Sequence, residues 1–75
     1  MELQIGTIVK SYDFPGITDC YIIGRVTNIE EDMLSCEVIK QVSCGKEKVG
    51  HKTFRTPMQG AMMMDDKFER VVVIG

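Results

Sequence analysis

Cationic side chains gather in one short segment of the chain, together with an aromatic residue. Between residues 46 and 55, lysine, histidine and arginine recur, and Glu47 is the only acid among them. Cations neutralise backbone phosphates and an aromatic ring stacks on a base, which is how single-stranded nucleic acids are bound without sequence preference. The segment therefore predicts a contact with single-stranded nucleic acid, made by Lys46, Lys48, Lys52, Phe54 and Arg55.

The same segment nearly matches a phosphate-binding loop, but its spacing is wrong. Such a loop needs two glycines separated by four residues, with a lysine and a hydroxyl residue directly after the second glycine. Gly45 and Gly50 have that separation, but His51 stands before Lys52 and displaces the lysine. No helical pattern follows whose N-terminus could hold the anion. The segment therefore predicts no nucleotide-binding loop.

Nucleophilic or metal chemistry would need the three cysteines and the single histidine. Zinc sites use sets of Cys and His ligands, often with two cysteines close in sequence. Cys20, Cys36 and Cys44 are widely spaced, and their odd number makes a poor disulfide framework, which predicts free, partly buried thiols. Spacing alone leaves open a cysteine paired with His51, but a histidine in a charged, glycine-flanked loop favours a solvated side chain. We expect no catalytic residue, no metal, no cofactor and no enzyme.

Methionines are concentrated before the last apolar run of the chain. Methionine is flexible and polarisable, so it fills irregular gaps in a core and also serves adaptable binding surfaces. Three consecutive residues cannot all face one side of an extended chain, which predicts an exposed Met63. The segment is either a lid over one end of the fold or a surface for a protein partner, and both can hold. Together with aromatic residues of the first loop, the predicted protein-binding residues are Tyr12, Phe14, Met58, Met62, Met63 and Met64.

Length and composition restrict the class of protein. The 75 residues make a single domain, residues 1–75, and a chain of this length buries only about 60% of its unfolded surface. The net charge is −2, which argues against a general nucleic-acid binder. The first residues show no signal peptide, and no apolar run approaches the ~20 residues of a membrane helix. We expect a cytoplasmic protein that does not contact membranes.

Short runs of β-branched residues predict the elements that must position these side chains. Alternation with a two-residue period predicts strands at 3–9, 20–30 and 33–42, and two further strands are predicted at 51–55 and 70–74. The last run lacks polar alternation, which favours a strand covered on both faces or one that completes a barrel. Gly24 predicts a bulge or bend, and the acids at 30–32 predict a hairpin turn. Residues 11–19 are a predicted loop, residues 43–52 are predicted to be a long hairpin tip or a loop, and residues 60–69 hold at most one helical turn.

Five short strands with a long first loop predict a closed all-β sheet, because closure removes exposed edges. The residues from Gly6 to Val9, the long loop, and Gly24-Arg25-Val26 before a tight hairpin resemble SH3-like barrels of the KOW and Tudor type. That resemblance implies a small five-stranded SH3-like β-barrel with a Met-rich lid or turn before its last strand. The series DFPG, DCY, GRV and FRTPMQG also resembles short uncharacterised proteins of tailed phages, marine ones especially, and implies no particular function.

These observations favour a non-enzymatic binding module. The favoured partner is a protein, contacted by the Met-rich segment and the first loop, as a phage-type accessory protein in the cytoplasm of a host cell would do. An exposed Met63 also suits a homodimer, since large apolar patches are uncommon on monomers. The alternative partner is single-stranded nucleic acid, contacted by the basic segment from Lys46 to Arg55.

Overall fold

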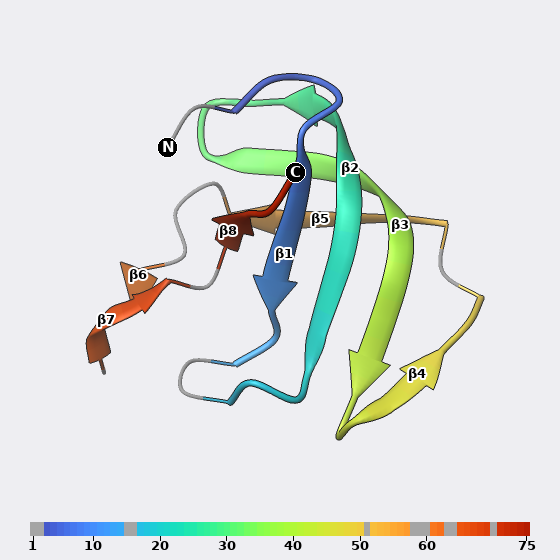
Figure 1. Cartoon of the computed structure of the whole chain (residues 1–75). Coiled ribbons are helices and arrows are strands. Elements are labelled where there is room, and N and C mark those ends of the chain that lie inside the picture. The colour runs from blue at the N-terminus through green and yellow to red at the C-terminus, as the bar shows by residue number, and fades with distance from the viewer. Residues whose placement is uncertain (1–2, 15–16, 51, 58–60, 63–64, 70) are drawn as a thin grey trace.

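The computed structural model describes residues 3–14, 17–50, 52–57, 61–62, 65–69 and 71–75 (Figure 1). Within these ranges every regular element is a β-strand and there is no helix, so the predicted all-β class is confirmed. The strands are β1 (Ile8–Tyr12), β2 (Tyr21–Ile29), β3 (Met33–Ser43), β4 (Lys46–Lys48), β5 (Thr53–Pro57), β6 (Ala61–Met62), β7 (Asp65–Glu69) and β8 (Val71–Val73).

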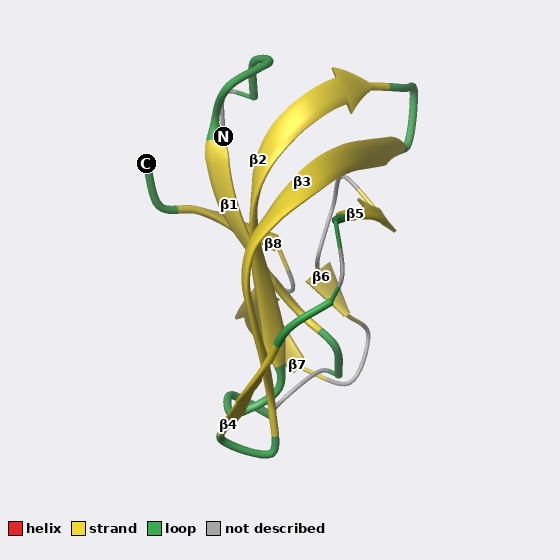
Figure 2. Ribbon diagram, turned by 90° about the vertical axis from the view of Figure 1, so that its right-hand side faces the viewer, coloured by secondary structure: helices red, strands yellow, loops and turns green. Residues whose placement is uncertain are grey.

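Six of these strands form one antiparallel sheet, and β6 pairs with β7 in a separate two-stranded sheet. The order in the large sheet is β4-β3-β2-β1-β8, and β5 pairs with β3 as well. The long strand β3 pairs with β5 along its first half and with β4 near its end. Figure 2 shows β2 and β3 bending strongly along their length, with β5 lying below their bent ends. No pairing joins β5 to β8 within the described ranges, so the sheet is not closed into a barrel there.

The bend in β2 and β3 coincides with two irregularities in their pairing. The register shifts between Ile23 and Gly24, where Ile39 of β3 has no partner, and again between Val26 and Asn28. An extra residue on one strand bends the pair and increases its twist. The predicted irregularity at Gly24 is therefore confirmed, although the extra residue belongs to β3. The bent ends fold over the inner face of the sheet and enclose the core.

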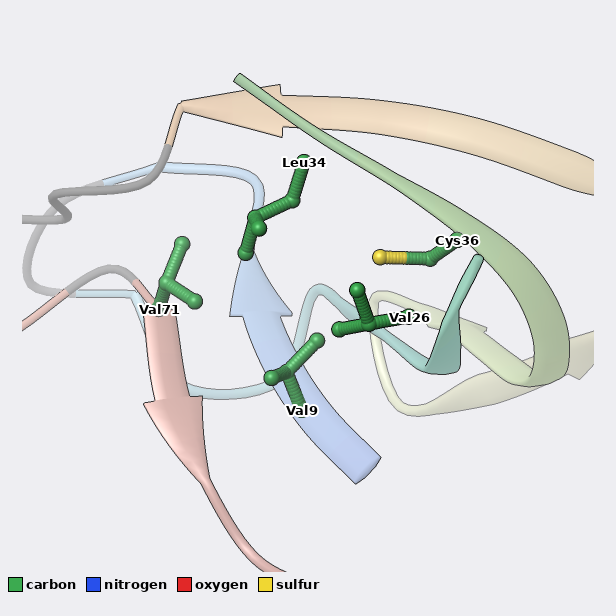
Figure 3. Close-up of a cluster of buried hydrophobic side chains, with 5 residues drawn as sticks. All are labelled: Val9, Val26, Leu34, Cys36 and Val71. Atoms are coloured by element: carbon green, nitrogen blue, oxygen red, sulfur yellow. The ribbon is translucent and has the colours of Figure 1, made fainter. Parts of the chain in front are cut away.

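The core is a small cluster of aliphatic side chains and one thiol on the inner face of the sheet. Figure 3 shows these side chains, which come from β1, β2, β3 and β8, pointing toward one another. On the same face, the hydroxyls of Ser11 and Thr56 form a buried hydrogen bond of 2.7 Å. This bond joins β1 to β5, which are distant in sequence, and satisfies two polar groups that would be costly to bury alone. The fully buried cluster consists of Val9, Val26, Leu34, Cys36 and Val71.

Two predictions at the ends of the chain need correction. The first strand begins at Ile8 rather than at residue 3, because Gly6 has a positive φ of 99° and the Thr7 amide donates to the Gln4 carbonyl, which makes a turn. The last strand, β8, is not covered on both faces, and among the described residues it pairs with β1 alone. It lies at the edge of the sheet beside β1, and only Val71 of its residues is buried.

Residues 43–52, predicted as a long hairpin tip or loop, contain a tight hairpin turn and a short strand. Cys44 and Gly45 have positive φ angles of 53° and 78°, and Ser43 pairs with Lys46 across them. Positive φ at both central residues is typical of a type I′ turn, the tightest connection between antiparallel strands. The basic segment therefore begins with strand β4. Residues 61–62 and 65–69 form the paired strands β6 and β7.

Candidate functional site

Four aromatic or apolar side chains lie at the end of β1, in the first loop and at the start of β2. Phe14 and Ile17 lie in the loop with 55% and 43% of their surface exposed, and the Ile17 amide donates to the Phe14 carbonyl. Tyr12 and Tyr21 face each other across β1 and β2 with their rings edge to face and their centroids 6.1 Å apart. We call these four residues the first-loop surface.

A lysine fixes the two tyrosine rings of the first-loop surface. The Nζ atom of Lys10 lies 4.1 Å from the ring centroid of Tyr21 and 5.1 Å from that of Tyr12. An ammonium group this close to a ring face is attracted by about 0.5–1 kcal/mol at an exposed site. Lys10 pairs with Ile23 on β2, and Ile23 pairs with Lys40 on β3, so two cations share the outer face with the rings. The surface combines apolar area with positive charge.

The methionine part of the predicted protein-binding site falls outside what the structure describes. Met58, Met63 and Met64 lie outside the described residues, and so does the predicted exposure of Met63. Met62 ends strand β6, which pairs with β7. Of the predicted set, Tyr12 and Phe14 are therefore the residues with a described environment, and the first loop brings both to one end of the sheet.

The structure separates the residues of the predicted nucleic-acid site. Lys46, Lys48 and Lys52 are exposed, and none of them has an ion-pair partner in the part of the chain that the structure describes. Phe54 is half-buried and packs against the core, so its ring is not an open stacking platform. Arg55 donates through one nitrogen to both carboxylate oxygens of Glu30, each at 3.0 Å.

Alternation along β5 explains why Phe54 and Arg55 are separated. Cys36 pairs with Phe54, and both face the core, so the neighbouring Arg55 points outward. There it meets Glu30 from the turn between β2 and β3, a contact that sequence spacing does not reveal. A second exposed ion pair joins Arg25 to Glu37 at 3.5 Å. Exposed pairs of this kind stabilise the fold by less than about 1 kcal/mol each, so their main effect is to neutralise charge.

The three cysteines occupy different environments. Cys36 is buried in the core as its strand pattern predicts, and desolvation raises the pKa of its thiol above 9.0. Cys20 is buried before β2, whereas Cys44 is exposed in the β3–β4 turn, yet their Sγ atoms are 4.0 Å apart. The Cys44 amide donates to the Cys20 sulfur and lowers the pKa of that thiol, but desolvation and the neighbouring Cys44 raise it, and the net pKa is raised. Sequence spacing gave no sign of this pair.

Neither metal ligands nor membrane-crossing helices are found among the residues described. Within residues 3–14, 17–50, 52–57, 61–62, 65–69 and 71–75, no group of three or more His, Cys, Asp or Glu side chains is placed to hold a metal ion. Over the same ranges there is no helix long and apolar enough to cross a membrane. Comparisons of the chain with protein-family models, curated proteins and solved structures found no match.

Proposed function

We propose that the chain is a non-enzymatic binding module that contacts a protein partner through the first-loop surface. The observation that carries the proposal is the exposure of Phe14 and Ile17 in the loop that joins the strands of the paired Tyr12 and Tyr21 rings. Aromatic residues are enriched in the energetically important centres of protein interfaces. The Met-rich segment, Met58 and Met62 to Met64, belongs to the proposed surface on sequence grounds, because methionines adapt to a partner.

The arrangement of the sheet supports membership of the SH3-like class as part of this proposal. Strands β1, β2, β3 and β5 follow one another as antiparallel neighbours, and β8 returns to β1. Buried Ser11 and Thr56 bring β5 toward β1 across the interior, as a barrel-like curvature requires. A phage-type accessory protein in the cytoplasm of a host cell is the setting that we propose. Folds of this class host many functions, so the surface and not the fold carries the functional argument.

We predict that polar substitutions in the first loop abolish partner capture without unfolding the protein. Phe14→Ser combined with Ile17→Ser removes two exposed apolar side chains, and losing an aromatic anchor commonly weakens binding at least about tenfold. The matched control is Ile39→Ser, because Ile39 is 51% exposed at the β3 bulge, away from the first loop. Each tagged variant is incubated with a lysate of the cells that produce the protein, and the retained proteins are compared. Equal capture by the loop variant and wild type would refute the proposal.

The alternative partner, single-stranded nucleic acid, is supported by the exposed lysines of the basic segment. Lys46, Lys48 and Lys52 point to solvent without ion-pair partners among the described residues. The same experiment distinguishes the two partners when it includes a variant with all three lysines changed to glutamine. Loss of binding in that variant, with affinity falling steeply as salt rises, supports the nucleic acid, since phosphate contacts release counterions. Loss of binding in the loop variant, with an affinity that depends only weakly on salt, supports a protein partner.

A further inference from the structure

The thiols of Cys20 and Cys44 come from two segments that the sheet holds side by side. Tyr21 pairs with Val42 where β2 and β3 meet, and the Gly45 amide donates to the Asp19 carbonyl at 2.9 Å. These contacts fix the residues before β2 beside the β3–β4 turn. The two Sγ atoms are 4.0 Å apart, about 2 Å more than a disulfide bond length. Joining them requires the two sulfur atoms to approach by that distance, through side-chain rotation and a shift of the turn.

The conformation at Cys44 is a second, independent observation. Its φ of 53° lies in the left-handed region, which residues with a Cβ atom adopt at a cost. Asparagine, aspartate and glycine are the residues that suit the first central position of a type I′ turn. A cysteine stands here instead, and the turn aims its amide at the Cys20 sulfur at 3.2 Å. The turn therefore presents one thiol to solvent directly beside a second, covered thiol.

We infer that Cys20 and Cys44 form a redox-active pair that a low-molecular-weight disulfide converts into an intrachain disulfide. The exposed Cys44 thiolate attacks one sulfur of the small disulfide, forms a mixed disulfide and releases one small thiolate. The Cys20 thiolate then attacks the Cys44 sulfur, closes the Cys20–Cys44 bond and releases the second small thiolate. The protein loses two electrons, the small disulfide gains them, and the two protons of the cysteines pass to the released thiolates.

The bond would fasten the start of β2 to the β3–β4 turn. Closing a ring in the chain limits the unfolded state, so a disulfide with acceptable geometry stabilises a fold. We expect the thermal midpoint to rise on the order of 10 °C in a domain of this length. Cys36 takes no part, because it is buried in the core on β3. It is the internal control for the reaction.

The test treats the full chain, folded and dilute, with oxidised glutathione as the probe. Remaining thiols are blocked with iodoacetamide under denaturing conditions, and intact mass with peptide mapping locates each bond. We expect a Cys20–Cys44 link in wild type and in Cys36→Ala, with only Cys36 alkylated in wild type, and a midpoint that falls again on reduction. In Cys20→Ala we expect the reaction to stop at a glutathione adduct on Cys44. An unresolved adduct on wild-type Cys44, a link through Cys36, or no reaction while the protein stays folded would each overturn the inference.

Discussion

Replacing Leu34 with alanine is expected to lower the free energy of unfolding by about 2–5 kcal/mol. Leu34 is fully buried in the core and pairs with Ile29 on one side and Thr56 on the other. The lost methyl groups remove transfer free energy and leave a cavity between three strands. A domain of this length has a total stability of about 4–11 kcal/mol, so the variant loses a large part of it.

Urea unfolding followed by circular dichroism measures this loss. The control is Ile39→Ala on the same strand, which removes an aliphatic side chain from an exposed bulge. That change is expected to alter stability by no more than about 0.5 kcal/mol. Similar losses in both variants would contradict a core centred on Leu34 and with it the bent sheet that encloses the cluster.

Replacing Gly24 with alanine is expected to cost about 1–3 kcal/mol or more, although alanine carries only one additional carbon. A Cβ atom there would lie 2.5 Å from Cε1 of Phe54, 2.8 Å from the Glu37 carbonyl oxygen and 3.0 Å from Cβ of Cys36. The φ angle of Gly24 is outside the left-handed region, so backbone conformation does not oppose the substitution. Crowding alone decides the result, and part of that crowding comes from backbone that cannot move aside.

A companion variant separates the two sources of crowding at Gly24. Phe54→Leu shortens the side chain that lies closest, so Gly24→Ala should cost less in that background than in wild type. Recovery should be incomplete, because the Glu37 carbonyl remains in place. Asn28→Ala, at an exposed position of the same strand, serves as the control and should be nearly neutral. Wild-type stability of Gly24→Ala in the same urea experiment would show that Phe54 does not pack where we describe it.

The central hairpin could be predicted from sequence because its two strands bury one face. Residues 20–30 and 33–42 alternate clearly, and β2 and β3 fall within them to a residue or so. The acidic turn between them is confirmed, with the Glu30 amide donating to the Met33 carbonyl. Alternation in residues 3–7 predicted a strand, but Ile5 is 69% exposed there and the chain forms a turn. A hairpin tip at residues 43–52 was among the predictions, but its tight turn at Cys44-Gly45 was not located because cysteine is an unusual residue at a positive φ.

The candidate site was predictable only in its local parts. The first loop could be located from proline, glycine and aspartate, and Tyr12 and Phe14 from their place beside it. The burial of Phe54 could not be predicted, because alternation marks a strand without showing which of its faces is buried. Contacts such as Arg55 with Glu30 and Cys20 with Cys44 join residues far apart in sequence. These contacts depend on strand pairing and on the bend of the sheet, and neither can be read from a local sequence pattern.

Photocrosslinking from position 14 tests most directly the claim that the first-loop surface contacts a protein. A benzophenone amino acid replaces Phe14 in one variant and Ile39 in another, because both side chains are about half exposed, the first in the loop after β1 and the second at the bulge of β3. Each variant is irradiated in a nuclease-treated lysate of the producing cells at physiological salt. Discrete protein adducts from position 14, absent from position 39, are the expected result. Identical adducts from both positions would contradict a protein contact at the first-loop surface. The absence of any adduct from position 14 would contradict it as well.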